Sequence, residues 1–531
     1  MLDNAPSLLL ERTSSLFLVE QSHRPNLGIS SAKQNEDNLT VLEKYVQEAF
    51  ASLSNYPNFR IGRQTTMFQV GLDSINAVQL ASRFRRDNYD VSASDVLQRP
   101  SIADLAALLE SKGEYAKSHE SNFDFIAFKA RYLAAICSEN CILTDTVEAV
   151  RPATPLQQGM LAQFIRSEGQ EYLNYLCLEF EDNIPVETLI MAWETVAKSH
   201  QILRSGFSHV KDPEYPFAMV SYNKSGFQLP WTALAENEAC IWSPASWRRA
   251  CASEIQQNLH LPTWRILVQP HDGKRIVHLL LLHSLYDAYS LNLIFDDLAL
   301  ALQASEPDPR PSFEPVLSTL LDAAKDSDSH RLFWEAQGSQ MAVNRFPTMT
   351  PLRMDEKTLS VLCHTCEKSF AELKEGCREA NVTLQAAGQA AWARLLAAYI
   401  GEDNVTFAVV FSGRVVRGAE AVSFPCITTV PYSCSVASGS RRLLDGTMRF
   451  NAAVQDHQFV PLTKIQRWIG HPEGALFDTL FAFQKAQRAE SSTRLWKIID
   501  EDATVDVSMP SLNEIRLTIL VLCLNRNGTS R

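Results

Sequence analysis

The spacing of apolar residues changes once along this chain, and that change most limits the folds open to it. Between Asn38 and Lys112, apolar side chains recur at helical spacing in separate short stretches, which is typical of amphipathic helices packed on one another. From Phe123 onward, alternating or continuous apolar runs are interspersed with helical stretches, which is typical of a mixed α/β fold. The sequence therefore predicts a small helical unit followed by a larger α/β unit.

The small unit is expected to contain helices over about 42–53, 73–84 and 101–109. Ser101 with Asp104 three residues later resembles the capping box that starts a helix. Residues 1–36 show no sustained periodicity, and residues 110–122 are polar. These two segments are interpreted as a tail and a solvated linker.

In the large unit, the apolar pattern predicts strands near 176–180, 265–269, 275–282 and 405–411. Of these four strands, 275–282 is nearly continuously apolar, which favours a strand buried on both faces. Helices are expected over 189–196, 289–302 and 384–400. The Pro-rich stretch 307–315 indicates a hinge between two lobes.

Charge and composition exclude several classes of protein. The 49 Lys and Arg residues against 61 Asp and Glu residues give a formal net charge of −12, which argues against a general nucleic-acid or anionic-membrane binder. The longest apolar run, Ile519–Leu524, is far shorter than the ~20 residues that span a bilayer. Charged residues near the N-terminus exclude a clean signal peptide. The odd number of cysteines, 11, indicates a reducing compartment, so we expect a cytoplasmic protein.

The first candidate chemical site is Ser74, in the string Phe68-Gln-Val-Gly71-Leu72-Asp73-Ser74. Gly71 allows a sharp turn, and the serine falls at the first turn of the helix that follows. A phosphate ester there would meet unpaired N–H groups and the positive end of the helix dipole. Taken alone, the pattern fits an ordinary N-cap serine at least as well. A hydrolase nucleophile elbow fits poorly, because G-x-S-x-G is absent.

The surroundings of this serine resemble a known family. The short helices, the aromatic before the loop, the G-L-D-S-I string and the Pro-Ser-Ile start of the last helix are similar to the peptidyl carrier domain of nonribosomal peptide synthetases. The resemblance implies a four-helix bundle with 4′-phosphopantetheine attached covalently to Ser74. Asp73 and Leu72 would belong to the same cofactor-binding segment, and a phosphopantetheinyl transferase would load the serine.

The second candidate site is Leu282-His283-Ser-Leu-Tyr-Asp287-Ala288, where a predicted strand ends and a helix begins. Alone, a locally satisfied histidine with an aspartate near a helix start fits equally well. The segment nevertheless resembles the H-H-x-x-x-D-G motif of condensation domains, and further motifs of that family follow in order. They resemble the stretches Arg151–Met160, Ser199–Phe207, Ser412–Arg414, Pro425–Thr428 and Leu476–Phe481.

The resemblance implies an α/β two-lobed fold of the chloramphenicol-acetyltransferase type that joins a carrier-bound acyl group to the amine on another carrier. His283 would orient the amine or accept its proton, which suits an imidazole with an ordinary pKa of about 6.5. It would lie in a channel open to both carriers' arms. Asp287 would form a structural ion pair with an arginine. Arg414 is the first candidate for that partner and Arg204 the second.

Two departures from the family's pattern leave alternatives open. The first histidine of the motif is Leu282 here, and its glycine is Ala288. We favour an active enzyme. One alternative is a catalytically degenerate, condensation-like docking module that recruits partner enzymes. Another is an acyltransferase that uses free coenzyme A thioesters, against which the attached carrier argues.

The expected domains are a tail (1–36), the carrier (37–113), a linker and entry helix (114–145), the N-terminal lobe (146–310) and the C-terminal lobe (311–531). The resemblance to condensation domains ends near Asp502, and residues 508–531 do not show the pattern of the strands that would close the second lobe. The last lobe is therefore expected to be incomplete. No adenylation signature is found. We therefore expect an adenylation domain and upstream and downstream carriers as partners, and no nucleic acid or membrane span.

Three further segments carry weaker signals. The order of domains and the segment 477–484 resemble terminal units of ferrichrome-type hydroxamate siderophore synthetases. The Cys363–Cys366 spacing lacks a second cysteine pair, so core cysteines are favoured over a metal site. Arg83, Arg85 and Arg86 are interpreted as the solvated end of a helix.

Overall fold

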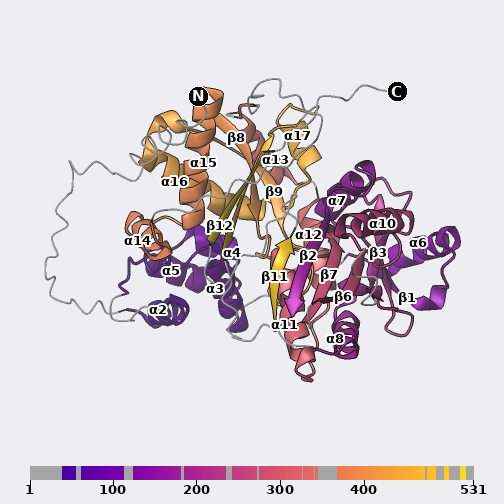
Figure 1. Ribbon diagram of the computed structural model, residues 1–531. Coiled ribbons are helices and arrows are strands. Elements are labelled where there is room, and N and C mark those ends of the chain that lie inside the picture. The colour runs from indigo at the N-terminus through magenta and orange to yellow at the C-terminus, as the bar shows by residue number, and fades with distance from the viewer. Residues whose placement is uncertain are drawn as a thin grey trace, which may run out of the picture.

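The computed structural model describes residues 39–54, 61–112, 123–180, 184–234, 242–271, 274–325, 327–339, 341–344, 368–472, 475–485, 495–501 and 515–521. A small helical domain lies beside two larger lobes, each built around a sheet (Figure 1). Among the described helices, none is both long enough and apolar enough to cross a bilayer.

The small domain consists of helices α2 (Val41–Ser54), α3 (Ser74–Arg86), α4 (Ala93–Gln98) and α5 (Ile102–Lys112). The three helices expected from periodicity are confirmed, and the Ser101 hydroxyl accepts from the Asp104 N–H at 3.1 Å, as a capping box requires. The short α4 was not located from the sequence, because a single turn and a half shows little periodicity. Phe50, Leu80 and Phe84 lie fully buried in the core of this bundle.

The N-terminal lobe is formed by alternating helices and strands, and every predicted element in it is confirmed. Its central sheet has the strand order β11-β2-β7-β6-β5, and a second sheet has the order β1-β4-β3. The elements are α6 (Phe125–Asn140), β1 (Val147–Pro152), α7 (Pro155–Arg166), β2 (Leu173–Phe180), α8 (Val186–Ser199), β3 (Ser205–His209), β4 (Phe217–Tyr222), β5 (Trp231–Ala233), α10 (Pro244–Gln257), β6 (Trp264–His271), β7 (Lys274–Leu282) and α11 (Ala288–Leu302).

The pairing of β2 with β7 positions the second candidate site. The two strands run antiparallel, and their register pairs Leu173 with Leu282. β7 is buried from Ile276 to Leu282, as its continuous apolar run predicts. The residue after the end of β7, His283, therefore lies beside the residue before β2, Tyr172.

The C-terminal lobe follows the Pro-rich stretch that connects α11 with α12. Its sheet has the strand order β12-β10-β8-β9. The elements are α12 (Glu314–Ala323), α13 (Asp328–Gly338), α14 (Phe370–Ala380), α15 (Leu384–Ile400), β8 (Asn404–Phe411), β9 (Thr428–Ser435), α16 (Ser440–Ala453), α17 (Leu462–Trp468), β10 (Thr479–Lys485), β11 (Trp496–Glu501) and β12 (Ile515–Val521). The predicted helix α15 and the predicted strand β8 are confirmed.

The last two strands join different sheets, and the first of them ties the lobes together. β11 leaves the C-terminal lobe and pairs with β2, so it completes the sheet of the N-terminal lobe (Figure 1). β12 pairs antiparallel with β10 over the register Thr479–Val521 to Lys485–Ile515. The expectation that 508–531 contributes no closing strand is therefore wrong for 515–521, where apolar and β-branched residues form a sheet edge. The domain boundaries and the incompleteness of the lobe stay predictions.

Candidate functional site

His283 opens a short 3-10 turn, His283–Leu285, directly after β7. Its backbone N–H donates to the Tyr172 carbonyl at 2.8 Å, which extends the β2–β7 ladder by one bond. Its Nδ1 lies 2.9 Å from the Tyr286 carbonyl oxygen. Because a carbonyl can only accept, Nδ1 carries the hydrogen, and the lone pair of the neutral ring is on Nε2. This tautomer suits a group that accepts a proton.

Aromatic and amide groups surround this imidazole. The ring centroids of Tyr172 and Tyr286 lie 6.3 and 5.0 Å from that of His283. The Tyr286 hydroxyl accepts from Asn174 Nδ2 at 2.7 Å, and both side chains are buried. Sequence reasoning missed Tyr286 and Asn174, since Tyr286 stands at a variable position of the motif and Asn174 lies more than 100 residues away. His283 itself is 4% exposed, so the expected open channel stays a prediction.

Gln157 is a further residue whose part in the site was missed. Its side-chain oxygen and backbone N–H form a capping box with Thr154 at the start of α7. Its Nε2 donates to the Ser284 carbonyl at 2.8 Å, in the turn that carries His283. The motif Arg151–Met160 signalled this segment without assigning Gln157 a role.

Asp287 caps the N-terminus of α11 and is fully buried. Its Oδ1 accepts from the Ser290 N–H at 2.8 Å, and its Oδ2 accepts from the Cys426 N–H at 2.8 Å. Arg414 Nη2 lies 2.6 Å from Oδ1, so the structure brings together the first predicted pair. The carboxylate thus joins α11 to two segments of the C-terminal lobe.

The Asp287–Arg414 pair is stable as a pair of charges despite its burial. Burial alone would raise the pKa of Asp287, but the Arg414 charge and the two backbone N–H bonds hold that pKa below its ordinary value. Arg414 also donates to the carbonyls of Ala419 and Phe424, and its guanidinium lies 4.3 Å from the centre of the Tyr289 ring. These bonds hold the loop after β8 around the arginine.

Arg204, the second predicted partner of Asp287, is not in this site. Its Nη1 pairs with Glu148 at 2.6 Å and donates to the Tyr222 carbonyl, inside the N-terminal lobe. The expectation of a catalytic-site role for Arg204 is wrong, because its motif follows α8 and faces β1 and β4 instead of α11.

The carrier site is arranged around a turn. Gly71 adopts φ +79°, which favours glycine, and Asp73 caps α3 by accepting from the Asn76 N–H at 3.2 Å. Leu72 is 4% exposed and belongs to the bundle core, so it holds the loop and does not line a cofactor site. Ser74 is the first residue of α3. Its side chain lies outside the described residues.

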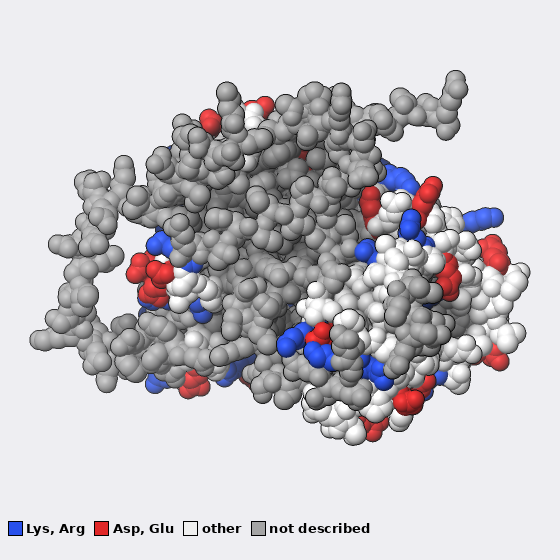
Figure 2. Space-filling model, viewed as in Figure 1, with Lys and Arg blue, Asp and Glu red and all other residues white. Residues whose placement is uncertain are grey.

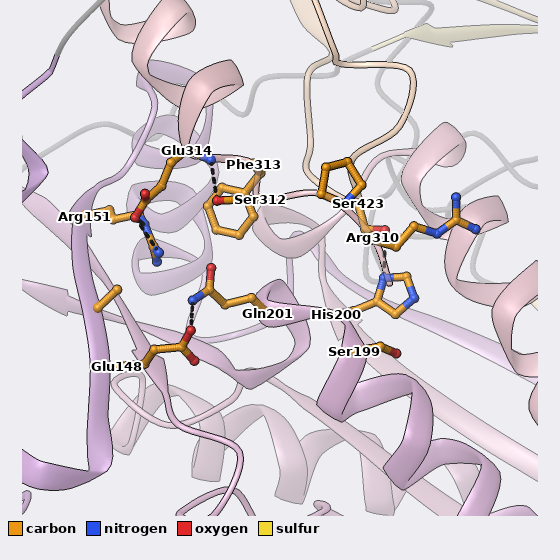
Figure 3. A pocket seen from close by; sticks show the side chains of 12 residues that line it. Glu148, Arg151, Ser199, His200, Gln201, Arg310, Ser312, Phe313, Glu314 and Ser423 are labelled. Carbon is orange, nitrogen blue, oxygen red and sulfur yellow. Dashed lines mark hydrogen bonds and ion pairs between the residues drawn. The ribbon is translucent and has the colours of Figure 1, made fainter. Parts of the chain in front are cut away.

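A polar pocket of about 440 Å³ lies at the junction between the lobes (Figure 3). Its charged residues are already paired. Arg151 binds Glu314 at 2.7 Å, and Asp297 accepts from both His200 and Arg310 at 2.8 and 2.7 Å. His283 is not among its lining residues. We interpret this pocket as a structural junction that fixes the start of the C-terminal lobe.

Metal-site geometry is not found among the described residues, where no group of three or more His, Cys, Asp or Glu side chains could hold an ion. The Cys363–Cys366 pair lies outside the described part of the chain.

Two protein families match the chain. The family described as "Phosphopantetheine attachment site" matches residues 44–109, and the family described as "Condensation domain" matches residues 147–521. The first match assigns 4′-phosphopantetheine as a covalent cofactor carried on a serine. The second assigns the large domain an amide-forming transferase activity.

Curated relatives are much longer than this chain. "Nonribosomal peptide synthetase 2" of Cochliobolus heterostrophus is 38% identical over 92% of the chain, which spans 9% of that relative. "Nonribosomal peptide synthetase sidC" of Arthroderma benhamiae is 36% identical over 89% of the chain and 9% of the relative. The "Hydroxamate-type ferrichrome siderophore peptide synthetase" of Schizosaccharomyces pombe is 27% identical over 89% of the chain and 10% of the relative.

Solved structures agree on the fold. A four-domain nonribosomal peptide synthetase bound to AMP and glycine has a TM-score of 0.51 at 15% identity, over 62% of this chain and 26% of that one. The condensation domain of the monacolin K polyketide synthase MokA has a TM-score of 0.50 at 14% identity, over 64% and 89%. The helical carrier is followed by an α/β fold of two lobes, and a family matches each part. The chain therefore belongs to the condensation domain family and is a carrier–condensation didomain of the nonribosomal peptide synthetase type.

Proposed function

We propose that Ser74 carries the phosphopantetheine arm and that His283 serves the condensation step. The observation that carries the proposal is the arrangement at the end of β7, where the Tyr286 carbonyl holds Nδ1 of His283 and Asp287 is locked by Arg414. Within the matched carrier residues, Ser74 opens α3 directly after the Gly71 turn. A helix start at this point favours an attached phosphate.

In the proposed reaction, the amine on one carrier attacks the thioester carbon on another. The C–N bond forms, the C–S bond breaks, and the thiolate leaves on the donor's pantetheine arm. Nε2 of His283 accepts or orients the proton that the attacking nitrogen loses. Holding both reactants on tethers makes the largest contribution to the rate, because good orientation in an intramolecular reaction lowers the activation barrier by up to about 7–11 kcal/mol.

Asp287 and Arg414 are positioning residues in this proposal. Their pair fixes the N-terminus of α11 and, with it, the turn that carries His283. Leu282, which replaces the family's first histidine, is fully buried in the apolar core and supplies packing. Ala288 is half-buried at the start of α11, where its added methyl group leaves the helix cap intact.

The substrates and partners are proposed from the relatives. We infer that the didomain works in hydroxamate siderophore assembly in the cytoplasm, receiving acyl groups activated by an adenylation domain and passed by neighbouring carriers. The similarity to synthetases named for siderophores supports this product class. A phosphopantetheinyl transferase would load Ser74.

Loading and condensation are tested on the full chain by mass spectrometry. After treatment with a phosphopantetheinyl transferase and coenzyme A, the wild-type chain should gain the mass of one phosphopantetheine, and Ser74→Ala should gain none. An exposed serine of the same domain, Ser111→Ala, is the matched control and should load like the wild type. If the wild-type chain takes up no such mass, the carrier assignment is wrong.

Condensation is then followed with an acyl-loaded partner carrier. Product should form on the wild-type chain and, within the same reaction time, only at a small fraction of that yield on His283→Ala. Equal yields from both would favour the non-catalytic docking module instead.

A further inference from the structure

The carrier domain is docked on the C-terminal lobe of the same chain. In the part of the chain that the structure describes, three hydrogen bonds between side chains cross the boundary, each from the carrier to a different segment of the lobe. They join Thr66 Oγ1 to Asn381 Oδ1 at 2.6 Å, Ser82 Oγ to Glu420 Oε1 at 2.9 Å, and Ser94 Oγ to Asp456 Oδ2 at 2.7 Å. The spread of these contacts over the carrier fixes its orientation.

Apolar packing supports the same orientation. The side chains of Val415, Met448 and Ala452 from the C-terminal lobe pack against the buried core of the carrier bundle. α4 of the carrier lies against α16 of the lobe (Figure 1). The carrier core and the lobe therefore share one apolar interface.

In this docked arrangement, α14 of the lobe lies over the turn that precedes Ser74. The Lys374 ammonium lies 3.4 Å from the point where a Cβ on Gly71 would stand, and its Cε lies 3.0 Å from that point. Arg378, one helical turn further on, donates from Nη1 to the Gln69 carbonyl at 3.4 Å. Two basic residues of α14 thus face the segment 69–71.

Of these two residues, Lys374 is the one whose charge is not balanced by a described counter-ion. Arg378 is paired with Glu375 on the same helix, and Glu372 is engaged by Ser369. Lys374 is exposed, and among the described residues it has no hydrogen-bond or ion-pair partner. Where α14 lies, acidic and basic side chains occur together on the surface (Figure 2).

The stretch of carrier sequence around Ser74 carries no basic residue. Residues 64–82 contain neither lysine nor arginine, while Asp73 places a carboxylate immediately before the serine. A phosphodiester on Ser74 would add a second negative charge at this turn. The helix dipole of α3 offsets only part of it. A cation from α14 would complement the remaining charge.

We propose that Lys374 binds the phosphodiester of the phosphopantetheine arm while the carrier is docked on the C-terminal lobe. This inference rests on the proposed attachment of the arm to Ser74. A lysine suits the role because its ammonium is a flexible point charge that can reach a phosphate oxygen. The contact positions the root of the arm, and it takes no part in the bond changes of the condensation step.

The test uses the full chain loaded with phosphopantetheine, observed by ³¹P NMR. In the wild type, the phosphodiester resonance should be broad and should shift as salt is raised, since added salt screens the ion pair. Lys374→Gln should narrow the resonance and remove its salt dependence, and Lys374→Arg should restore both. Lys211→Glu, at an exposed lysine of the N-terminal lobe, is the charge-changing control and should match the wild type.

The rate of product formation gives a second readout. Since exposed ion pairs have small effects, Lys374→Glu should lower the single-turnover rate about two- to fivefold without changing the extent of loading. Identical ³¹P resonances in the wild type and Lys374→Gln would overturn the inference while leaving the attachment of the arm intact. A wild-type chain that cannot be loaded would overturn the proposed function, and this inference with it.

Discussion

His283 and Asp287 are four residues apart but have different surroundings, so we propose different roles for them. The histidine has one nitrogen fixed by a carbonyl, which leaves the other as the acceptor. The carboxylate oxygens of the aspartate accept hydrogen bonds from an arginine and from two backbone N–H groups. These bonds hold the fold together. These surroundings support the proposal that His283, and not Asp287, accepts the proton.

Replacement of His283 by alanine tests this division directly. Because general acid–base groups contribute about 10²–10⁴-fold, His283→Ala should slow single-turnover amide formation by that factor. The loaded mass of the chain should be unchanged. A His283→Ala rate within threefold of the wild type would contradict the assignment.

Breaking the buried ion pair should destabilise the fold. Arg414→Met leaves the Asp287 carboxylate buried without its counter-charge, at a cost of about 3–5 kcal/mol in the free energy of unfolding. Urea unfolding at neutral pH measures this change, with the exposed Arg131→Met as control. The double variant Asp287→Asn, Arg414→Met removes both charges and should recover part of the loss. An Arg414→Met variant as stable as the control would show that the pair is dispensable.

The same carboxylate makes stability depend on pH. Its pKa in the folded state is below its ordinary value, so it contributes stability that is fully present above the unfolded pKa of about 3.9 and is lost as the pH falls through the folded value. The stability gap between the wild type and Asp287→Asn should therefore be constant from pH 7 to 5 and shrink below pH 4. Urea midpoints at pH 7, 5, 4 and 3 measure it. A constant gap down to pH 3 would contradict the lowered pKa.

At the scale of elements, the loop after β8 packs tightly against the segment that precedes β9, within the C-terminal lobe. Gly413 adopts φ +62°, and a Cβ there would stand 1.7 Å from the Cys426 carbonyl oxygen. That carbonyl belongs to the residue whose N–H binds Asp287. The turn at Gly413 thus lets Arg414 reach α11.

Gly413→Ala should consequently destabilise the chain by more than about 2 kcal/mol, because both its φ and the contact with Cys426 are incompatible with a side chain. Gly159→Ala is the matched control. Gly159 lies inside α7 with nothing within 4 Å of its added methyl group, so this change should stabilise by about 0.5–1 kcal/mol. Thermal unfolding of both variants checks the pair, and equal melting temperatures would contradict it.

The elements that were predicted are those whose burial is one-sided or complete. The continuous run in β7 and the stripe in α8 each correspond to an element at the expected place. The capping box at Ser101 located the start of α5. α4 was missed because six residues are too few for a helical period to show. β12 was missed because its segment is a short sheet edge formed by pairing with a distant strand.

On the scale of the whole molecule, the docked carrier is held by both polar and apolar contacts. Met448→Asp would place a charge against the carrier core, so it should release the carrier while both domains stay folded. Small-angle X-ray scattering should report a larger radius of gyration, and amide exchange in α4 should accelerate. Arg442→Asp on the exposed side of α16 is the control. An unchanged radius for Met448→Asp would show that the interface does not depend on this packing.

The sequence by itself determined the order of domains and those helices and strands whose apolar period is clear, and it located the segments that contain Ser74 and His283, because each is encoded by neighbouring residues. Only the tertiary structure decided which arginine pairs with Asp287. Arg414 and Arg204 carry the same charge in equally plausible motifs, and their partners depend on which distant strands lie beside them. The same holds for Asn174 and Lys374, whose positions follow from strand register and from how the carrier packs on the lobe, and neither is recorded in local periodicity.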